Sequence, residues 1–262
     1  MARVRLYPDA PHLSVSLYCE HLTDREAFAA LAEVVRRRGG ASNGYVKVIP
    51  AGLEYRSLTD LPVDVRVELA VDAVEFDRLV AGDDPDRTVV KAEFMTREAG
   101  LLVVSQLSRT GGDRHPVDAS VYADALGIPP WAWEEGDEER AGVLAAWARG
   151  LFRAACEHVD PLYAELTIET TLATPSALGD ADIGNVYVAD RLLVADPHLE
   201  HDLRMTFETG DVARWRTGLY CSTWASFNEA GRSAGDLSRD IGKTTGWLLA
   251  RAWEIMTYDP DA

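Results

Sequence analysis

The chain has 262 residues, of which 47% are hydrophobic, enough apolar material for a folded core. It carries 26 basic and 43 acidic residues, a formal net charge of −17. This charge excludes proteins that bind nucleic acids or anionic membranes through a broadly basic surface, because phosphate groups would be repelled over most of the molecule. The sequence therefore predicts a folded protein with no nucleic-acid and no membrane partner.

The cysteines and the N-terminus point to a compartment. Cys19, Cys156 and Cys221 are widely spaced in apolar patterns, unlike the paired cysteines of small secreted domains, and are expected to be buried free thiols. The N-terminal residues contain no apolar run of signal-peptide length, and no window approaches the ~20 apolar residues of a membrane span. These features predict a cytoplasmic protein.

The first 110 residues read as strands with two helices between them. Alternating residues predict a half-buried strand at 13–19, and Thr23 with Glu26 forms a capping box that begins a helix ending near Gly39. The other expected elements are strands at 45–49, 53–58 and 65–71, a short helix after Asp72, and a hairpin of 89–95 with 101–107.

The pattern breaks from 108 to 136, where glycines and prolines cluster, and this segment is interpreted as a crossing between two halves. From Asp137 to Val159 apolar residues recur at three-four spacing and predict a long central helix that Asp137 caps and Asp160-Pro161 ends.

The remaining residues again read as strands with helices between them. A strand is expected at 162–172, with Leu166 on a packed face and Glu165 on a wetter one, then a short strand at 186–188. A helix capped by Asp196, a strand at 215–227 and a closing helix at 236–256 complete the chain.

These elements predict an α+β fold of mixed, largely antiparallel sheets backed by helices. The expected organisation is an N-terminal half at 1–110, a crossing segment at 111–136 and a C-terminal half at 137–262, which could pack as one domain. A short echo between residues 17–20 and 162–165 raises the alternative of two related halves around the central helix.

Candidate catalytic carboxylates lie on the strand after the central helix. Glu165 and Glu169 are four residues apart and would project from the same strand face. Paired carboxylates perform acid–base chemistry when burial separates their pKa values, although solvated residues on a sheet face are the commoner case.

A candidate partner site precedes the central helix. Trp131 and Trp133 lie in a proline-rich loop that continues into Glu134 and Glu135. Tryptophan is enriched among the residues that dominate binding energy, and the alternative is that both rings pack inward.

Metal and cofactor sites are not expected. His198 and His201 are three residues apart on a predicted helix and could share a zinc ion, but no third ligand accompanies them and the apolar stripe of the helix faces the other way. Gly242-Lys243-Thr244 resembles part of a phosphate-binding loop, yet Leu237 stands where that motif requires glycine.

Two segments resemble known bacterial proteins. His158-Val159-Asp160-Pro161-Leu162-Tyr163, leading into a strand, and the later Arg216-Thr217-Gly218-Leu219-Tyr220-Cys221 are similar to uncharacterised proteins grouped with the immunity proteins of polymorphic toxins. The resemblance covers residues 137–227. It implies an α+β protein that binds and neutralises a partner toxin, and it transfers no catalytic residues.

The leading hypothesis is a cytoplasmic, non-enzymatic protein whose acidic surface meets a basic protein partner. The alternative is a small-molecule enzyme or ligand-binding protein that uses Glu165 and Glu169 in a cleft between the halves. A deep pocket that holds these carboxylates and a histidine would favour the alternative, whereas an acidic face with exposed tryptophans would favour the first.

Overall fold

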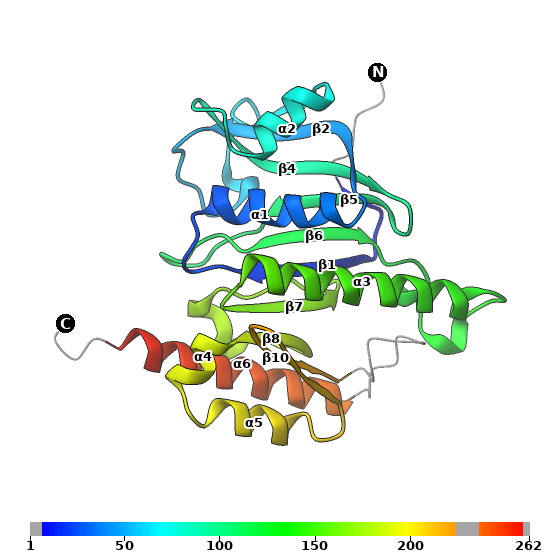
Figure 1. The fold of residues 1–262 in the computed structure, drawn as a ribbon, viewed down its shortest axis with the longest axis vertical. Helices are drawn as coiled ribbons and strands as arrows, with labels where there is room; N and C mark the ends of the chain where they lie inside the picture. Colours follow the sequence, from blue (N-terminus) through cyan, green and yellow to red (C-terminus); the bar gives the residue numbers. More distant parts are fainter. Residues whose placement is uncertain (1–6, 224–235, 259–262) are drawn as a thin grey trace.

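Ten antiparallel strands form one continuous sheet in the computed structural model, which describes residues 7–223 and 236–258 (Figure 1). The strand order is β3-β2-β4-β5-β6-β1-β7-β8-β10-β9, so the first strand lies near the middle of the sheet. The strands are β1 (His12–Tyr18), β2 (Ala41–Pro50), β3 (Val67–Ala70), β4 (Arg87–Thr96), β5 (Gly100–Gln106), β6 (Val117–Tyr122), β7 (Tyr163–Ile168), β8 (Asn185–Ala189), β9 (Asp211–Trp215) and β10 (Gly218–Ser222). The predicted α+β class is confirmed, with a single sheet in place of several.

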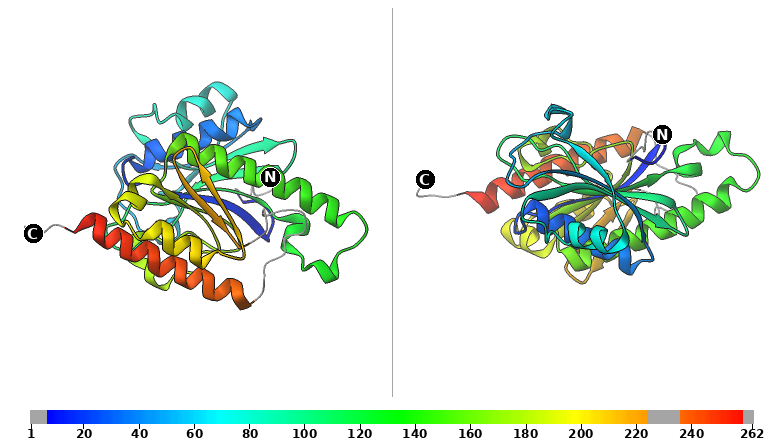
Figure 2. Two further views of the ribbon diagram at one scale, coloured as in Figure 1. Left: turned by 60° about the horizontal axis from the view of Figure 1, so that its bottom comes forward. Right: turned by 90° about the horizontal axis from the view of Figure 1, so that it is seen from above.

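Helices lie on both faces of this sheet. The α-helices are α1 (Asp24–Arg37), α2 (Ala73–Val80), α3 (Asp137–Val159), α4 (Asp190–Ala195), α5 (Leu199–Thr206) and α6 (Asp236–Thr257). Short 3-10 helices are η1 (Leu58–Asp60), η2 (Asp124–Gly127), η3 (Pro130–Ala132) and η4 (Pro175–Asp180). In Figure 2, α3 and α6 lie on opposite sides of the strands.

The first face of the sheet carries the larger core. Leu13, Val15 and Leu17 of β1 project toward α1 and α3, and they belong to one buried cluster that extends from Val46 in β2 to Trp215 in β9. The alternation of strands makes this possible, because residues two apart share a face.

The second face is covered by helices only at one end. There α4, α5 and α6 pack on β7, β8 and β10 through a second cluster that includes Leu199, Leu219 and Leu249. At the other end, around β4, β5 and β6, the same face carries polar residues and is approached by loops. The described helices therefore leave one half of the second face uncovered.

The central helix α3 begins and ends as predicted, with different local chemistry. Gly136 precedes it at a φ of 86°, and the Asp137 carboxylate accepts from the backbone N–H of Glu134 in the preceding loop, where capping of the helix itself was expected. Asp160 ends the helix in the left-handed region, with φ and ψ of 54°.

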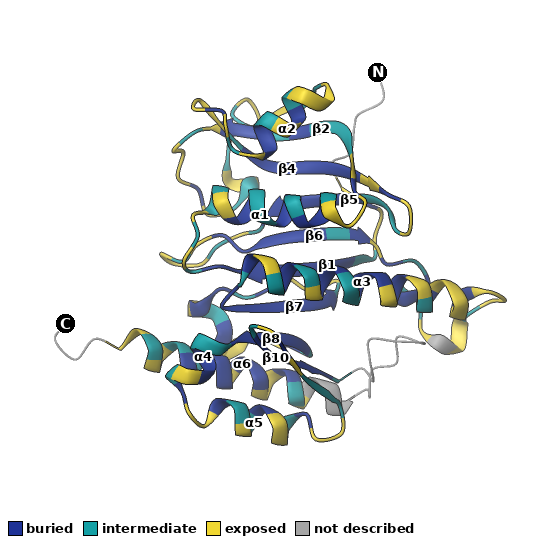
Figure 3. Cartoon of the chain, in the orientation of Figure 1, coloured by how far each residue is buried: buried dark blue, intermediate teal, exposed yellow. Residues whose placement is uncertain are grey.

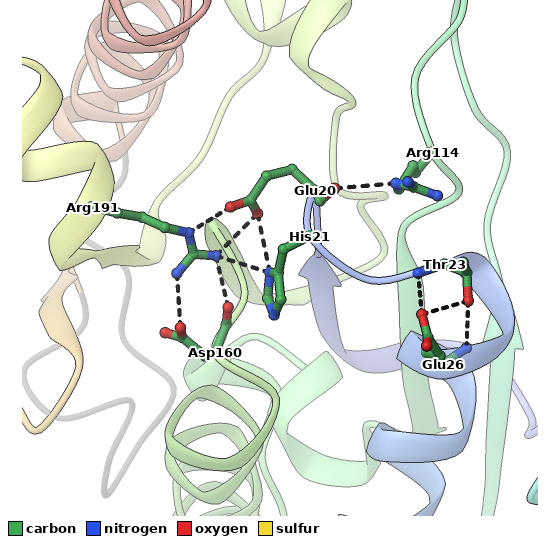
Figure 4. A network of polar contacts seen from close by, with 7 residues as sticks. All are labelled: Glu20, His21, Thr23, Glu26, Arg114, Asp160 and Arg191. Carbon is green, nitrogen blue, oxygen red and sulfur yellow. Dashed lines mark hydrogen bonds and ion pairs between the residues drawn. The ribbon is translucent and has the colours of Figure 1, made fainter.

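An arginine holds the end of α3 to its neighbours (Figure 4). Arg191, on α4, donates to the Asp160 carbonyl at 2.7 Å and pairs with the Asp160 carboxylate at 3.0 Å. The same guanidinium pairs with Glu20 in the connection from β1 to α1. Three segments far apart in sequence are thus joined at one end of the central strands β1 and β7.

Several predicted boundaries are wrong. The expected crossing segment contains strand β6, which pairs with both β1 and β5. No strand forms at 53–58, which holds irregular backbone and the start of η1, and β7 ends at Ile168, short of the predicted 172. The predicted strand at 215–227 is a hairpin of β9 and β10, and its last residues lie outside the described ones.

The three cysteines are buried free thiols, as predicted. Burial raises the pKa of Cys19 and of Cys221 to about 12, so neither is an activated thiolate. Among residues 7–223 and 236–258, no helix combines the length and apolar character that crossing a membrane requires.

Removal of the capping box should weaken α1 measurably. Thr23 Oγ1 accepts from the Glu26 N–H at 3.2 Å, and Glu26 accepts from the Thr23 N–H at 2.8 Å. Thr23→Ala should therefore lower the free energy of unfolding by about 1 kcal/mol in urea denaturation. Thr23→Ser keeps the hydroxyl and should retain most of the stability; equal losses in both variants would contradict the role of the cap.

Candidate functional site

A row of polar side chains crosses the second face of the sheet. The strand register places one residue from each of six neighbouring strands side by side. In spatial order this polar row is Lys47, Lys91, Ser105, Asp118, Ser16 and Glu165. All of them except Lys47 are buried, including Lys91 and Asp118 on strands whose second face none of the described helices covers, and burial is unusual for charged residues.

A pocket of about 380 Å³ opens over the middle of this row. It lies between the sheet, the segment at Tyr7, the η1 loop and the residues after β7. Its lining side chains from the sheet are His12, Ser14, Lys91, Val103, Ser105, Gln106, Asp118 and Ser120. The volume is at the lower end of the range for small-molecule sites.

Lys91 has the most unusual electrostatic environment in this pocket. Lys91 is only 4% exposed, and its Nζ lies 3.2 Å from the centroid of the Tyr7 ring. Burial, reinforced by the neighbouring charge of Lys47, lowers the pKa of Lys91 to about 7.

Asp118 lies two strands away in the same row and is linked to serines. Ser120 Oγ donates to the Asp118 carboxylate and lies 3.3 Å from Ser14 Oγ. Burial raises the pKa of Asp118 to about 6, so the carboxyl group gains or loses a proton near neutral pH. The pocket therefore contains an amine and a carboxyl group that both titrate close to neutrality.

The predicted pair of carboxylates does not form. Glu169 follows the end of β7 with a φ of 60°, so it does not continue the strand face of Glu165. Glu169 lines the pocket, and its Oε1 lies 3.1 Å from Nδ1 of His12, whose Nε2 is 3.1 Å from the Pro8 carbonyl.

Glu165 is buried, where the sequence predicted a wetter face. It is 3% exposed, and burial followed by the charge of Asp182 raises its pKa to about 8. A backbone hydrogen bond from Gly184 opposes this shift. Glu165 thus lies beneath the chain segment that leads into β8, whereas Glu169 faces the pocket.

The two tryptophans before α3 have different environments. Trp131 is 88% exposed, on η3. Trp133 is partly buried, and its indole N–H donates to the carbonyls of Ala125 and Ile128 at 3.1 and 2.8 Å. Trp133 therefore anchors the loop that presents Trp131.

Much of this loop and of the first turns of α3 is exposed (Figure 3), and the exposed residues include several glutamates. We call the surface formed by Glu98, Tyr122, Trp131, Glu134, Glu135, Glu138, Glu139 and Val143 the acidic end. A shallow hollow of about 350 Å³ lies within it, between the β4–β5 turn and α3. In the part of the chain that the structure describes, its five glutamates have no ion-pair partner.

The histidines considered as zinc ligands are both exposed. His198 precedes α5 and His201 lies in its first turn, while Leu199 and Leu203 of that helix are buried. Within residues 7–223 and 236–258, no three histidine, cysteine or acidic side chains gather as a metal-binding group.

The sequence analysis did not identify Lys91, Asp118, His12 or the serines as site residues. A signal was present, since Asp118 and Ser120 alternate with apolar residues, as do Ser14 and Ser16. Such alternation is equally typical of an ordinary half-solvated strand, and only the register shows that these residues converge.

Comparisons with known proteins give no family for this chain. No protein-family model matches it, and no curated protein matches it. A solved structure, Pseudomonas aeruginosa T6SS protein PA0821, is similar with a TM-score of 0.43 and 12% sequence identity, over 95% of this chain and 83% of that one. A likeness this distant is no argument about function, which has to come from the geometry.

Proposed function

We propose that this chain is a cytoplasmic binding protein of the immunity type, which captures a basic protein partner on the acidic end and thereby neutralises it. The observation that carries the proposal is that the five glutamates of the acidic end, the surface that also carries Trp131, have no ion-pair partner among the described residues. The resemblance of residues 137–227 to uncharacterised proteins grouped with immunity proteins and the net charge of −17 support it.

The charges of the acidic end differ from those elsewhere on the surface. Several glutamates on other helices pair with arginines of their own helix, as Glu33 does with Arg37 at 2.9 Å and Glu200 with Arg204 at 2.8 Å. At the start of α3, Arg140 is engaged by Asp124 and Asp137, which leaves the glutamates free for a partner. Unpaired carboxylates steer a basic protein toward this surface and accept its lysines and arginines.

Trp131 and Val143 supply the apolar part of the interface. Both are exposed, at 88% and 54%, and neighbour the carboxylates. Burial of a tryptophan in a partner pocket slows dissociation, whereas the surrounding charges mainly accelerate association. The two kinds of residue should therefore affect different rate constants.

The test uses the immobilised protein and the basic protein that it retains from extract of its own cells. Association should slow strongly between about 0.05 and 0.5 M salt, because the Debye length shortens. Trp131→Ala should increase the dissociation rate about tenfold or more and leave the salt dependence unchanged. Surface plasmon resonance measures both rates.

The control variant is Trp247→Ala, since Trp247 is also exposed but lies on α6, away from the acidic end. It should bind like the unchanged protein. Co-expression with the captured protein provides the functional readout, because neutralisation should restore growth with the unchanged chain and not with Trp131→Ala. If no basic protein is retained, or if binding is insensitive to salt and to Trp131→Ala, the proposal fails.

A further inference from the structure

Lys91 is a buried lysine with no carboxylate in direct contact among the described residues, although the charge of Asp118, two strands away, acts on it through space. Its cross-strand neighbour Lys47 pairs with Glu68 at 2.9 Å, so that carboxylate is already engaged. Across the described residues, Lys91 Nζ has its contact with the Tyr7 ring and no hydrogen bond or ion pair. A buried charge that lacks a partner destabilises the folded state. Such a cost is found mainly at functional sites, where the charge binds a ligand.

The pocket brings this ammonium group within reach of a bound molecule. Lys91 lines it from β4, and its neighbour Ser105 lines it from β5. The lining is rich in hydroxyl groups, which donate and accept hydrogen bonds: Ser14, Ser57, Thr59, Ser105, Ser108, Ser120, Thr170 and Thr171.

The acidic residues of the lining restrict the charge of the ligand. Asp118 and Glu169 both face the pocket, and they would repel a doubly charged phosphate ester. Glu169 is already engaged by His12 and Asp118 by Ser120, so Lys91 is the cation of the lining without a hydrogen-bonded or ion-paired carboxylate in the described residues. One carboxylate on the ligand matches it, and hydroxyl groups on the rest of the ligand match the serines.

Two further buried polar atoms lie on the second face. Within the described ranges, Ser16 Oγ, in the polar row, and Glu93 Oε1, two residues from Lys91, have no hydrogen-bond partner. The polar layer therefore contains groups that the described residues leave without hydrogen bonds. This is expected of a surface that binds a ligand and not of a packed core.

We propose that the pocket on the second face is a binding site for a small hydroxycarboxylate, with the ligand carboxylate on Lys91 and its hydroxyl groups on Ser105, Ser120 and Asp118. This site lies on the sheet face, built from different residues than the acidic end. It is independent of the proposed protein partner, and either function can fail without the other.

Titration calorimetry with lactate and gluconate tests the site, with propane-1,2-diol and sorbitol as their uncharged counterparts and inorganic phosphate as the second anion. At least one of the two carboxylates should bind, about tenfold or more tightly than its uncharged counterpart and than phosphate. The same carboxylate should raise the melting temperature of the protein, because it binds the folded state.

Lys91→Met should weaken this binding about tenfold or more, because the ammonium group is lost. Lys243→Met is the matched control, since Lys243 is exposed on α6, and should bind like the unchanged protein. Lys91→Met should also melt at an unchanged or higher temperature without ligand, which separates lost binding from misfolding. Ser105→Ala, a second variant that retains the amine, should weaken the same ligand by a smaller factor.

Two results would overturn the proposal. One is the absence of binding by both carboxylates at about 10 mM, where even a millimolar dissociation constant would be visible. The other is binding that Lys91→Met and Ser105→Ala both leave unchanged, because the ligand would then be held elsewhere.

Discussion

Glu165→Gln should stabilise the protein increasingly as the pH rises. Burial raises the pKa of Glu165 from 4.5 to about 8 in the folded state, so the folded protein holds this proton more tightly than the unfolded chain. The unchanged protein therefore loses stability as the pH rises from about 4.5 to about 8, and the loss is complete above the folded pKa.

Glutamine removes this titration while preserving the shape of the side chain. The two proteins should be similarly stable near pH 4.5, and the variant should be more stable by roughly 3 to 5 kcal/mol above pH 8, at 1.36 kcal/mol per pKa unit. Urea denaturation across this pH range measures the difference in free energy of unfolding between the two proteins. Contributions from other titrating groups, such as Lys91 and Asp118, are the same in both proteins and cancel in this difference.

Glu138→Gln is the control, because Glu138 is an exposed carboxylate on α3. Its stability should remain within about 0.5 kcal/mol of the unchanged protein at every pH. A Glu165→Gln variant whose advantage does not grow with pH would show that the carboxylate is solvated or paired when folded.

Leu151→Ala should lower the free energy of unfolding by about 2 to 5 kcal/mol. Leu151 is 1% exposed on the face of α3 that packs on the sheet, within the cluster that joins α1, α3 and the central strands. Truncation removes apolar burial and leaves a cavity in the layer on which both helices rest.

Val143→Ala, eight residues earlier on the exposed side of the same helix, provides the comparison. It should change stability by no more than about 0.5 kcal/mol, since it leaves no cavity. Equal effects of the two substitutions in chemical denaturation would contradict the packing of α3 on the first face.

The helices and hairpins were accessible to prediction because their signals are local. The capping box of α1, the three-four stripe of α3 and the β4–β5 hairpin each occupy one short stretch of sequence. Strand β6 was missed because its six residues stand among prolines and glycines typical of a loop. Its alternation of Val117, Ala119 and Val121 with polar residues was visible but too short to outweigh them.

Candidate residues near one another in sequence were identified more readily than those brought together by folding. Trp131 and the glutamates beside it lie in one stretch and form one surface. Glu165 and Glu169 were paired by their spacing, but the left-handed turn at Glu169 separates their directions. The backbone conformation of Glu169 sets the different directions of the two side chains, and an alternating sequence pattern cannot predict that conformation.

The sequence by itself determined the α+β class, most helices, the capping of α1 and the strongly acidic surface, because composition and periodicity are properties of neighbouring residues. Only the tertiary structure decided that ten strands form one sheet and that Glu165 is buried. It also decided that Lys91, Ser105 and Asp118, from three strands, line one pocket. The physical reason is strand register: a shift by one residue would exchange the two faces of a strand, and register is set by long-range pairing and packing.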